Sequence, residues 1–301
     1  SFAKCEEKLM YIQVKNLNYT YSKGLPNETK ALDNISFDVE ENSVLGVVGH
    51  TGSGKSTLLQ MLNGLLRPDD GEIIIGEDFI TEEGFPLVKI RRKVGLVFQY
   101  PEYQLFEETV RKDVAFGPKN LGIKDEEELE RLVRESIEKV GLDYETVKNR
   151  SPFELSGGQK RRVAIAGVIA MKPEVLILDE PTAGLDVEGR LSLHEQIRNL
   201  NSRGKTIVLA SHDMAVLIFV SHNMGDVARM ADKVIVLDRG KIAMEGSPEE
   251  VFSRDDELAA IGLGVPPVTE IMQSIADRVP EVKGDILTLD EAEEELVRVL
   301  A

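Results

Sequence analysis

Hydrophobic positions in the first hundred residues come in short runs of the β type. Three runs predict strands: Tyr11–Val14, Ile35–Val39 and Val44–Val48. The last is an unbroken apolar run ending at Gly49, which is typical of a strand buried on both faces that leads into a loop. Residues 56–66 then carry helical spacing, and residues 94–98 form another short strand candidate.

The middle of the chain changes to helical periodicity, and residues 108–171 are predicted to be mostly helix. Within Glu126–Val140 the apolar residues share one stripe: Leu129, Leu132, Val133, Ile137 and Val140. Glu130 and Arg134 stand four residues apart, as do Glu135 and Lys139, which predicts ion pairs on a solvated face. This segment is therefore expected to be a surface helix.

Strands return in the second half of the chain, at 175–178, 206–210, 216–220 and 234–237. Asp238–Lys241 predicts a turn into a final hairpin strand. Strands that alternate with helices indicate an α/β layer architecture.

Residues 246–301 differ from the rest of the chain in net charge and in the placement of their prolines. They hold 14 Asp and Glu against 4 Lys and Arg, a net of −10 out of −17 for the whole chain. Prolines at 266, 267 and 280 separate short amphipathic segments. We expect one large domain over residues 10–245, followed by an acidic helical extension over 246–301 that is a candidate for dimerisation.

Composition narrows the class of protein further. The acidic surface argues against nucleic acid as a partner, because phosphates need Lys and Arg to displace their counterions. Cys5 is the single cysteine, which rules out an internal disulfide and favours a reducing compartment. No apolar run approaches the roughly 20 residues that span a bilayer. Met10 is a candidate natural start, with residues 1–9 an extension that need not be native.

A glycine-rich loop follows the buried strand and precedes the predicted helix. It consists of Gly49, His50, Thr51, Gly52, Ser53, Gly54, Lys55, Ser56 and Thr57. Glycines let successive backbone N–H groups turn toward one anion at a helix N-terminus. This pattern predicts a phosphate-binding loop in which Lys55 reaches the β- and γ-phosphates and Ser56 ligates Mg²⁺.

An acidic pair and a second loop complete the candidate chemistry. Asp179 and Glu180 end an apolar strand, where Asp179 can hold the Mg²⁺ shell and Glu180 can polarise a water. Leu155–Gln159 reads Leu-Ser-Gly-Gly-Gln before a helix that begins near Lys160. Ser156 could be a plain helix cap, or its loop could bind an anion.

In this order the motifs resemble those of ABC-type ATPases, specifically their nucleotide-binding subunits, over about residues 10–245. The resemblance implies a P-loop NTPase with a RecA-like parallel-sheet core, an antiparallel β subdomain and a helical signature subdomain near residues 100–171. It also implies ATP and Mg²⁺, and a second ATPase subunit, identical or paralogous, packed head to tail. Ser156 and Gly158 would then contact the γ-phosphate of ATP bound to the partner.

The same resemblance assigns roles outside these loops. Gln99 matches a glutamine that touches Mg²⁺ or water and reports to a membrane partner, and Asp186 matches a loop that crosses the dimer interface. Tyr21 matches the aromatic residue that stacks on adenine. Tyr19 is an alternative, and either tyrosine could instead be an ordinary edge-strand aromatic.

The family's histidine beside the γ-phosphate has two candidates here. Residues 205–214 and 215–224 both read as an apolar run followed by Ser-His-Asp/Asn-Met, like a tandem duplication. His212 lies at the expected distance along the chain from Glu180. His222 is followed by the expected residues, 226–229, before the strand at 234. The more apolar second copy favours residues 216–220 as the buried strand and His222 as the site residue.

Residues 97–106, Val-Phe-Gln-Tyr-Pro-Glu-Tyr-Gln-Leu-Phe, are similar to the ATPase subunits of energy-coupling factor transporters. That narrower resemblance implies an importer of vitamins or transition-metal ions. It places the chain peripherally on the cytoplasmic face of the membrane, with a membrane coupling protein and a substrate-binding membrane protein. A soluble ABC ATPase not coupled to transport is the alternative, and the cargo would be selected by another chain.

Overall fold

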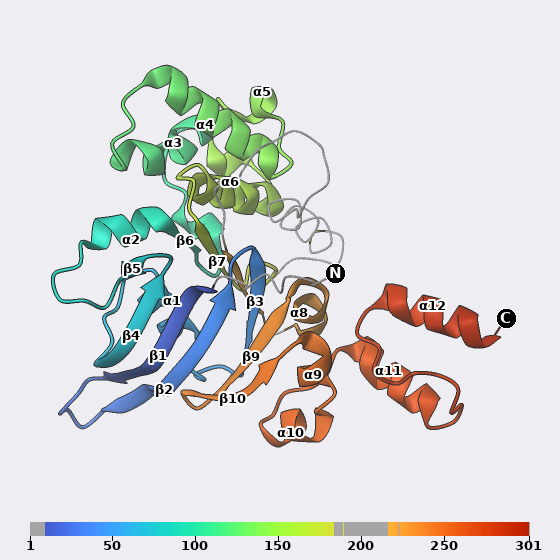
Figure 1. The fold of residues 1–301 in the computed structure, drawn as a ribbon. Coiled ribbons are helices and arrows are strands. Elements are labelled where there is room, and N and C mark those ends of the chain that lie inside the picture. Colours follow the sequence, from blue (N-terminus) through green and yellow to red (C-terminus); the bar gives the residue numbers. More distant parts are fainter. Residues whose placement is uncertain (1–9, 184–188, 190–215, 222, 301) are drawn as a thin grey trace, which may run out of the picture. The chain divides into compact units, whose positions relative to one another are not determined.

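The computed structural model describes residues 10–183, 189, 216–221 and 223–300 (Figure 1). The chain divides into two compact units. The first comprises residues 1–58, 67–81 and 219–301, and the second comprises residues 59–66 and 82–218. Each unit contains strands and helices of its own.

An antiparallel sheet forms the N-terminal part of the first unit. Its strands are β1 (Met10–Tyr21), β2 (Thr29–Glu40), β4 (Asp70–Ile75) and β5 (Asp78–Phe79), in the order β2-β1-β4-β5. Val14 of β1 lies opposite Phe37 of β2 and Ile73 of β4, and all three side chains are buried. Both strands predicted from the sequence exist, and each extends well beyond its apolar run.

A second set of strands in this unit leads to the glycine-rich loop. Strand β3 (Ser43–Val48) pairs in parallel with β9 (Lys233–Asp238), which pairs antiparallel with β10 (Lys241–Gly246). Every residue of β3 is buried, as its unbroken apolar run predicts. The hairpin at 238–241 is also confirmed. Residues 216–220 form β8, whereas the alternative strand at 206–210 lies outside the described residues.

Helix α1 (Lys55–Leu62) follows the glycine-rich loop and ends earlier than its apolar spacing predicts. Gly64 has a φ of 71°, and its N–H donates to Met61 O while the N–H of Leu65 donates to Gln60 O. This is the Schellman arrangement, in which a left-handed glycine closes the last helical turn. The prediction of a helix to residue 66 was therefore wrong by one turn.

The second unit contains a parallel strand pair and the helical region predicted for residues 108–171. Strands β6 (Val94–Val97) and β7 (Val175–Asp179) pair in parallel, with Leu96 opposite Ile177. The helices are α2 (Leu87–Lys93), η1 (Pro101–Gln104), α3 (Val110–Asn120), α4 (Glu126–Lys139), α5 (Tyr144–Val147), η2 (Pro152–Glu154) and α6 (Gly157–Ile169). The predicted apolar stripe on α4 is buried throughout.

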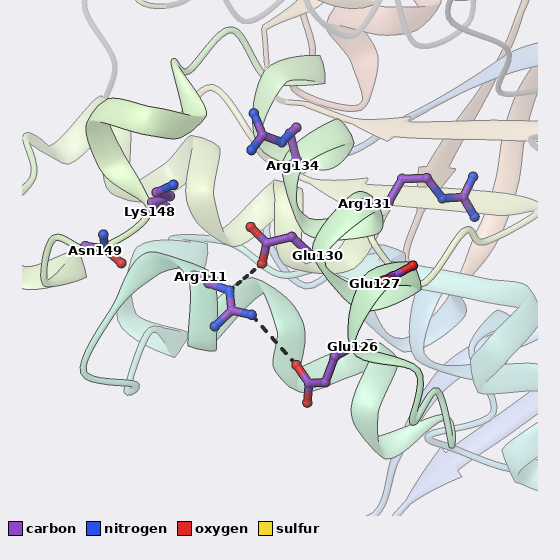
Figure 2. A pocket seen from close by; sticks show the side chains of 8 residues that line it. All are labelled: Arg111, Glu126, Glu127, Glu130, Arg131, Arg134, Lys148 and Asn149. Carbon is purple, nitrogen blue, oxygen red and sulfur yellow. Dashed lines mark hydrogen bonds and ion pairs between the residues drawn. The ribbon is translucent and has the colours of Figure 1, made fainter.

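The opposite face of α4 does not form the ion pair expected from its spacing. Glu130 accepts from Arg111 Nε at 2.5 Å and from the Tyr144 hydroxyl, whereas Arg134 donates to Glu145 at 2.8 Å. Figure 2 shows Arg111 between Glu126 and Glu130 in the pocket beside α4. Because α3 and α5 lie against this face, Glu130 and Arg134 have partners outside their own helix, so the prediction of a Glu130–Arg134 pair was wrong.

Helices follow β8 and β10 to the C-terminus. They are α8 (Met224–Met230), α9 (Pro248–Phe252), α10 (Asp255–Ala260), α11 (Pro267–Ala276) and α12 (Leu289–Leu300). Met272, Val282 and Ala292 form a small hydrophobic core around α11 and α12. None of the helices in the described part of the chain is both long and apolar enough to cross a membrane.

Candidate nucleotide site

The glycine-rich loop joins the buried end of β3 to the first turn of α1. Gly52 and Gly54 have φ values of 82° and 108°, in the region that disfavours any residue with a Cβ. A Cβ on Gly54 would also lie 2.7 Å from Ala31 O. The tight path of this loop therefore requires glycine at both positions.

The loop gathers polar groups suited to an anion. Lys55 is buried, and its Nζ donates to Gly49 O at 2.6 Å and to His50 O at 3.0 Å. Ser53 Oγ is buried and has no hydrogen-bond partner among the described residues. A buried hydroxyl without a partner costs about 1–3 kcal/mol, and a buried ammonium favours a counter-charge. A phosphate fits both requirements.

Tyr21 is connected to the first turn of α1. Its hydroxyl lies 3.1 Å from Thr57 Oγ1, and its ring packs edge-on against Tyr19 with ring centroids 4.8 Å apart. Ser56 is exposed on the same turn. Of the two tyrosines considered from the sequence, the structure brings Tyr21 into contact with the glycine-rich loop and its helix.

The acidic pair lies in the second unit, at the end of β7. Asp179 is the last residue of the strand, and Glu180 follows it with a φ of 48°. Gln99, just beyond β6, donates from Nε2 to Glu180 Oε2 at 2.7 Å. A left-handed glutamate costs on the order of 1 kcal/mol and occurs where the surroundings impose it, which is typical of functional sites.

Arg161 on α6 binds both segments that carry this pair, and the sequence analysis did not single it out. Its guanidinium donates to both oxygens of Glu102, at 3.1 and 2.9 Å, and to the carbonyls of Pro181 and Ala183, at 3.1 and 2.7 Å. Its side chain is only 4% exposed. One buried arginine thus ties the segment after Gln99 to the segment after Glu180.

We expect Arg161→Met to lower the free energy of unfolding by about 2–3 kcal/mol. The change leaves the Glu102 carboxylate and the carbonyls of Pro181 and Ala183 without their donor, and removing one partner of a buried ion pair is strongly destabilising. Urea unfolding of the full chain measures this loss, and adding Glu102→Gln should recover part of it. An equally stable Arg161→Met variant would contradict the arrangement.

The Leu-Ser-Gly-Gly-Gln loop opens α6 with a reciprocal cap. Ser156 Oγ accepts from Gln159 N at 3.3 Å, and Gln159 Oε1 accepts from Ser156 N at 3.1 Å. The helix-cap interpretation of Ser156 is therefore confirmed. A Cβ at Gly157 or Gly158 would meet nothing within 4 Å, so the backbone there is open to an approaching group.

The ABC transporter family description matches residues 32–183. An energy-coupling factor transporter ATP-binding protein EcfA2 of Clostridioides difficile is 51% identical over 97% of this chain and 98% of its own. The EcfA2 protein of Clostridium perfringens is also 51% identical, over 97% of this chain and 99% of its own.

The chain belongs to the ABC transporter ATPases. Within them it belongs with the ATP-binding proteins of energy-coupling factor transporters, as the sequence analysis predicted. The solved structure of cbiO1 from Clostridium perfringens, part of the ABC transporter complex cbiONQ, is similar with a TM-score of 0.71 and 34% identity over 88% of this chain and 99% of its own. The ATP-binding cassette MJ0796, solved as a dimer with ADP and Pi, is similar with a TM-score of 0.67 and 28% identity, over 79% of this chain and 98% of its own.

Membership fixes the fold and the enzyme class. The fold is the α/β P-loop architecture of ABC ATPases, and the activity is ATP hydrolysis coupled to transport. The structure does not describe Asp186, His212 or His222, so the choice between the two histidines stays a prediction.

The donors proposed for Mg²⁺ have the right chemistry for that ion. Ser56 offers a hydroxyl, Asp179 a carboxylate and Gln99 an amide oxygen, all hard ligands of the kind Mg²⁺ prefers. Among the described residues there is no cluster of three or more His, Cys, Asp or Glu. An ABC ATPase does not need one, because Mg²⁺ in such sites is held by few protein ligands and by substrate phosphates.

Proposed function

We propose that this chain hydrolyses ATP at Glu180 and transmits that event to a membrane partner through Gln99. The observation that carries the proposal is the 2.7 Å hydrogen bond from Gln99 Nε2 to Glu180 Oε2. The next residue, Tyr100, is exposed and also has a left-handed backbone, with a φ of 55°. The segment that contacts the proposed catalytic carboxylate thus continues directly into an exposed aromatic surface.

In this proposal the ATP phosphates lie on the loop from Gly49 to Thr57. Lys55 neutralises them, and Tyr21 stacks on the adenine. Ser56, Asp179 and Gln99 would hold the Mg²⁺, which would supply charge neutralisation at the phosphates. Glu180 orients and deprotonates the attacking water, and a histidine at 212 or 222 helps to hold the γ-phosphate.

The proposed assembly contains two ATPase chains and membrane components. Ser156 and Gly158 complete the ATP site of the second ATPase subunit, which is identical or paralogous to this chain. The membrane components are a coupling protein and a substrate-binding protein for a vitamin or a transition-metal ion. We infer that residues 10–245 form the ATPase and that the acidic helices of 246–301 are an extension of it, at the cytoplasmic face of the membrane.

The surface proposed to bind the coupling protein is formed by Tyr100, Tyr103 and Phe106. Their exposed fractions are 40%, 84% and 57%, and Phe106 packs edge-on against Phe116. Leu105 is buried and contributes to the local core instead. Exposed aromatic side chains clustered on one segment are typical of protein interfaces.

Replacing Tyr100 and Tyr103 together by alanine should release the chain from membranes that contain its partner. We expect association to fall about tenfold, since aromatic anchors dominate such interfaces, while basal ATP hydrolysis persists. Co-sedimentation with partner-containing membranes and phosphate release measure the two quantities. Phe79→Ala, which removes an exposed aromatic from β5, is the matched control. Unchanged association of the double variant would exclude this surface.

A further inference from the structure

The side chain of His50 occupies an unusual position within the phosphate loop. Its Nε2 lies 2.7 Å from Asp238 Oδ1, at the end of β9, and its Nδ1 lies 2.8 Å from the carbonyl oxygen of Thr51. A carbonyl oxygen and a carboxylate oxygen can only accept hydrogen bonds. Both contacts are satisfied together only when both ring nitrogens carry a proton, which makes His50 an imidazolium.

The electrostatic surroundings agree with this protonation state. The hydrogen bond to Thr51 O, followed by the hydrogen bond to Asp238, raises the pKa of His50 above its ordinary value, while partial burial and the charge of Lys55 oppose the rise. Opposite charge and hydrogen bonding to the charged form act in the same direction. Asp238 and Lys55 are the charged groups that face His50 from β9 and α1.

His50 also lines a pocket of about 600 Å³ with Thr51, Asn223 and Met224 of the first unit. The remaining wall is the segment 262–267 between α10 and α11, represented by Gly262, Leu263, Gly264, Val265 and Pro267. All of these neighbours are uncharged. Among the described residues that line this pocket, His50 is the only one able to carry charge.

The end of β9 and the turn that follows it contact the phosphate loop at two further points. Gly240 N donates to Ser53 O at 2.9 Å, and a Cβ on Gly49 would lie 2.3 Å from Leu237 O. The end of β9 and the turn after it therefore contact the loop at its start, at its middle and through His50. The His50–Asp238 pair is the charged member of this set of contacts.

We propose that His50 is a positioning residue for ATP, which fastens the phosphate loop to Asp238 and adds a second positive charge beside Lys55. The inference rests on the proposed function, in that the loop binds the phosphates of ATP. Loss of the proton removes one of the two hydrogen bonds and one positive charge. ATP affinity should therefore be full below the pKa of His50 and should fall as the pH rises through it.

Two measurements on the full-length chain test this proposal. Histidine-specific ¹³C labelling gives four histidine signals, and the one absent from His50→Gln belongs to position 50. Its NMR titration should show a midpoint above the ordinary histidine value. Calorimetric titration with Mg-ATP across the same pH range should show a loss of affinity with the same midpoint, about tenfold between the two limits.

Two variants separate charge from architecture. His50→Gln should weaken ATP binding about tenfold and abolish this pH dependence. Asp238→Asn should keep the loop in place but lower the NMR midpoint of His50 and shift the binding profile with it, which a purely structural role would not do. Lys241→Gln and Asp33→Asn, which alter the neighbouring Lys241–Asp33 ion pair, are matched charge controls and should leave both midpoints unchanged.

A His50 midpoint at or below the ordinary histidine value, or an affinity whose pH dependence is unchanged by Asp238→Asn, would overturn the proposal. Failure of the proposed function is a different result. A wild-type chain that did not bind Mg-ATP at any pH would refute ATP binding at this loop, while the NMR titration would still report the charge of His50.

Discussion

Glu180→Gln should bind ATP with nearly wild-type affinity and lose at least about a hundredfold of its turnover. The amide keeps the size of the side chain but cannot take a proton from water, and general-base catalysis contributes roughly 10²–10⁴-fold. Lys55→Ala should fail at the earlier step, because it removes the ammonium that the loop carbonyls hold at 2.6 and 3.0 Å. Its affinity for ATP should fall about tenfold or more.

Phosphate release and equilibrium binding of ATP distinguish the two defects. Glu174→Gln is the matched control, because Glu174 immediately precedes β7 and forms a surface ion pair with Lys93 at 3.5 Å. That variant should hydrolyse ATP normally. Wild-type turnover in Glu180→Gln would refute the catalytic assignment, and an unaltered ATP affinity in Lys55→Ala would refute the phosphate assignment.

Mixing a Lys55→Ala chain with a Ser156→Arg chain should restore activity that neither chain has alone. If two chains share each site, a mixed dimer places both lesions in one site and leaves the other intact. Random assortment of equal amounts then leaves about a quarter of all sites complete, as the symmetry of a two-chain assembly requires. Arginine at 156 fits the test because the neighbouring Gly157 and Gly158 backbone is open to an approaching group.

The mixing experiment needs hydrolysis assays of each variant alone and of the mixture at the same total concentration. A pair of Lys55→Ala preparations mixed together is the control and should stay inactive. Full activity of Ser156→Arg on its own would mean that each chain works as an independent unit. That outcome would refute the shared site, while leaving the assignment of Lys55 intact.

The sequence predicted the elements wherever local pattern determines them. The apolar run of β3, the glycine-rich loop and the stripe of α4 depend on neighbours in the chain, and all three were found as expected. The end of α1 was missed because Gly64 stops the helix while the apolar spacing continues to Leu66. The Glu130–Arg134 pair was missed because Arg111 and Tyr144 approach from other helices.

The candidate site also divides into features that depend on neighbouring residues and features that depend on distant ones. The loop from Gly49 to Thr57 and the acidic pair were predictable, since their residues are contiguous and their chemistry is visible in order. The partners of Arg161 lie 59, 20 and 22 residues away along the chain, and those of His50 include one 188 residues away. No spacing rule reaches so far. Nothing in the local sequence around Glu102 indicated that Arg161 would be its partner.

The left-handed backbone of Glu180 means that thermal stability and catalytic turnover favour different residues at this position. Glycine would adopt a φ of 48° without steric penalty, whereas glutamate pays on the order of 1 kcal/mol to remain there. A library of variants ranked by melting temperature would therefore enrich chains that lack the carboxylate, and one ranked by phosphate release would restore it. When this ATPase is selected for thermal stability, position 180 should therefore be kept as glutamate.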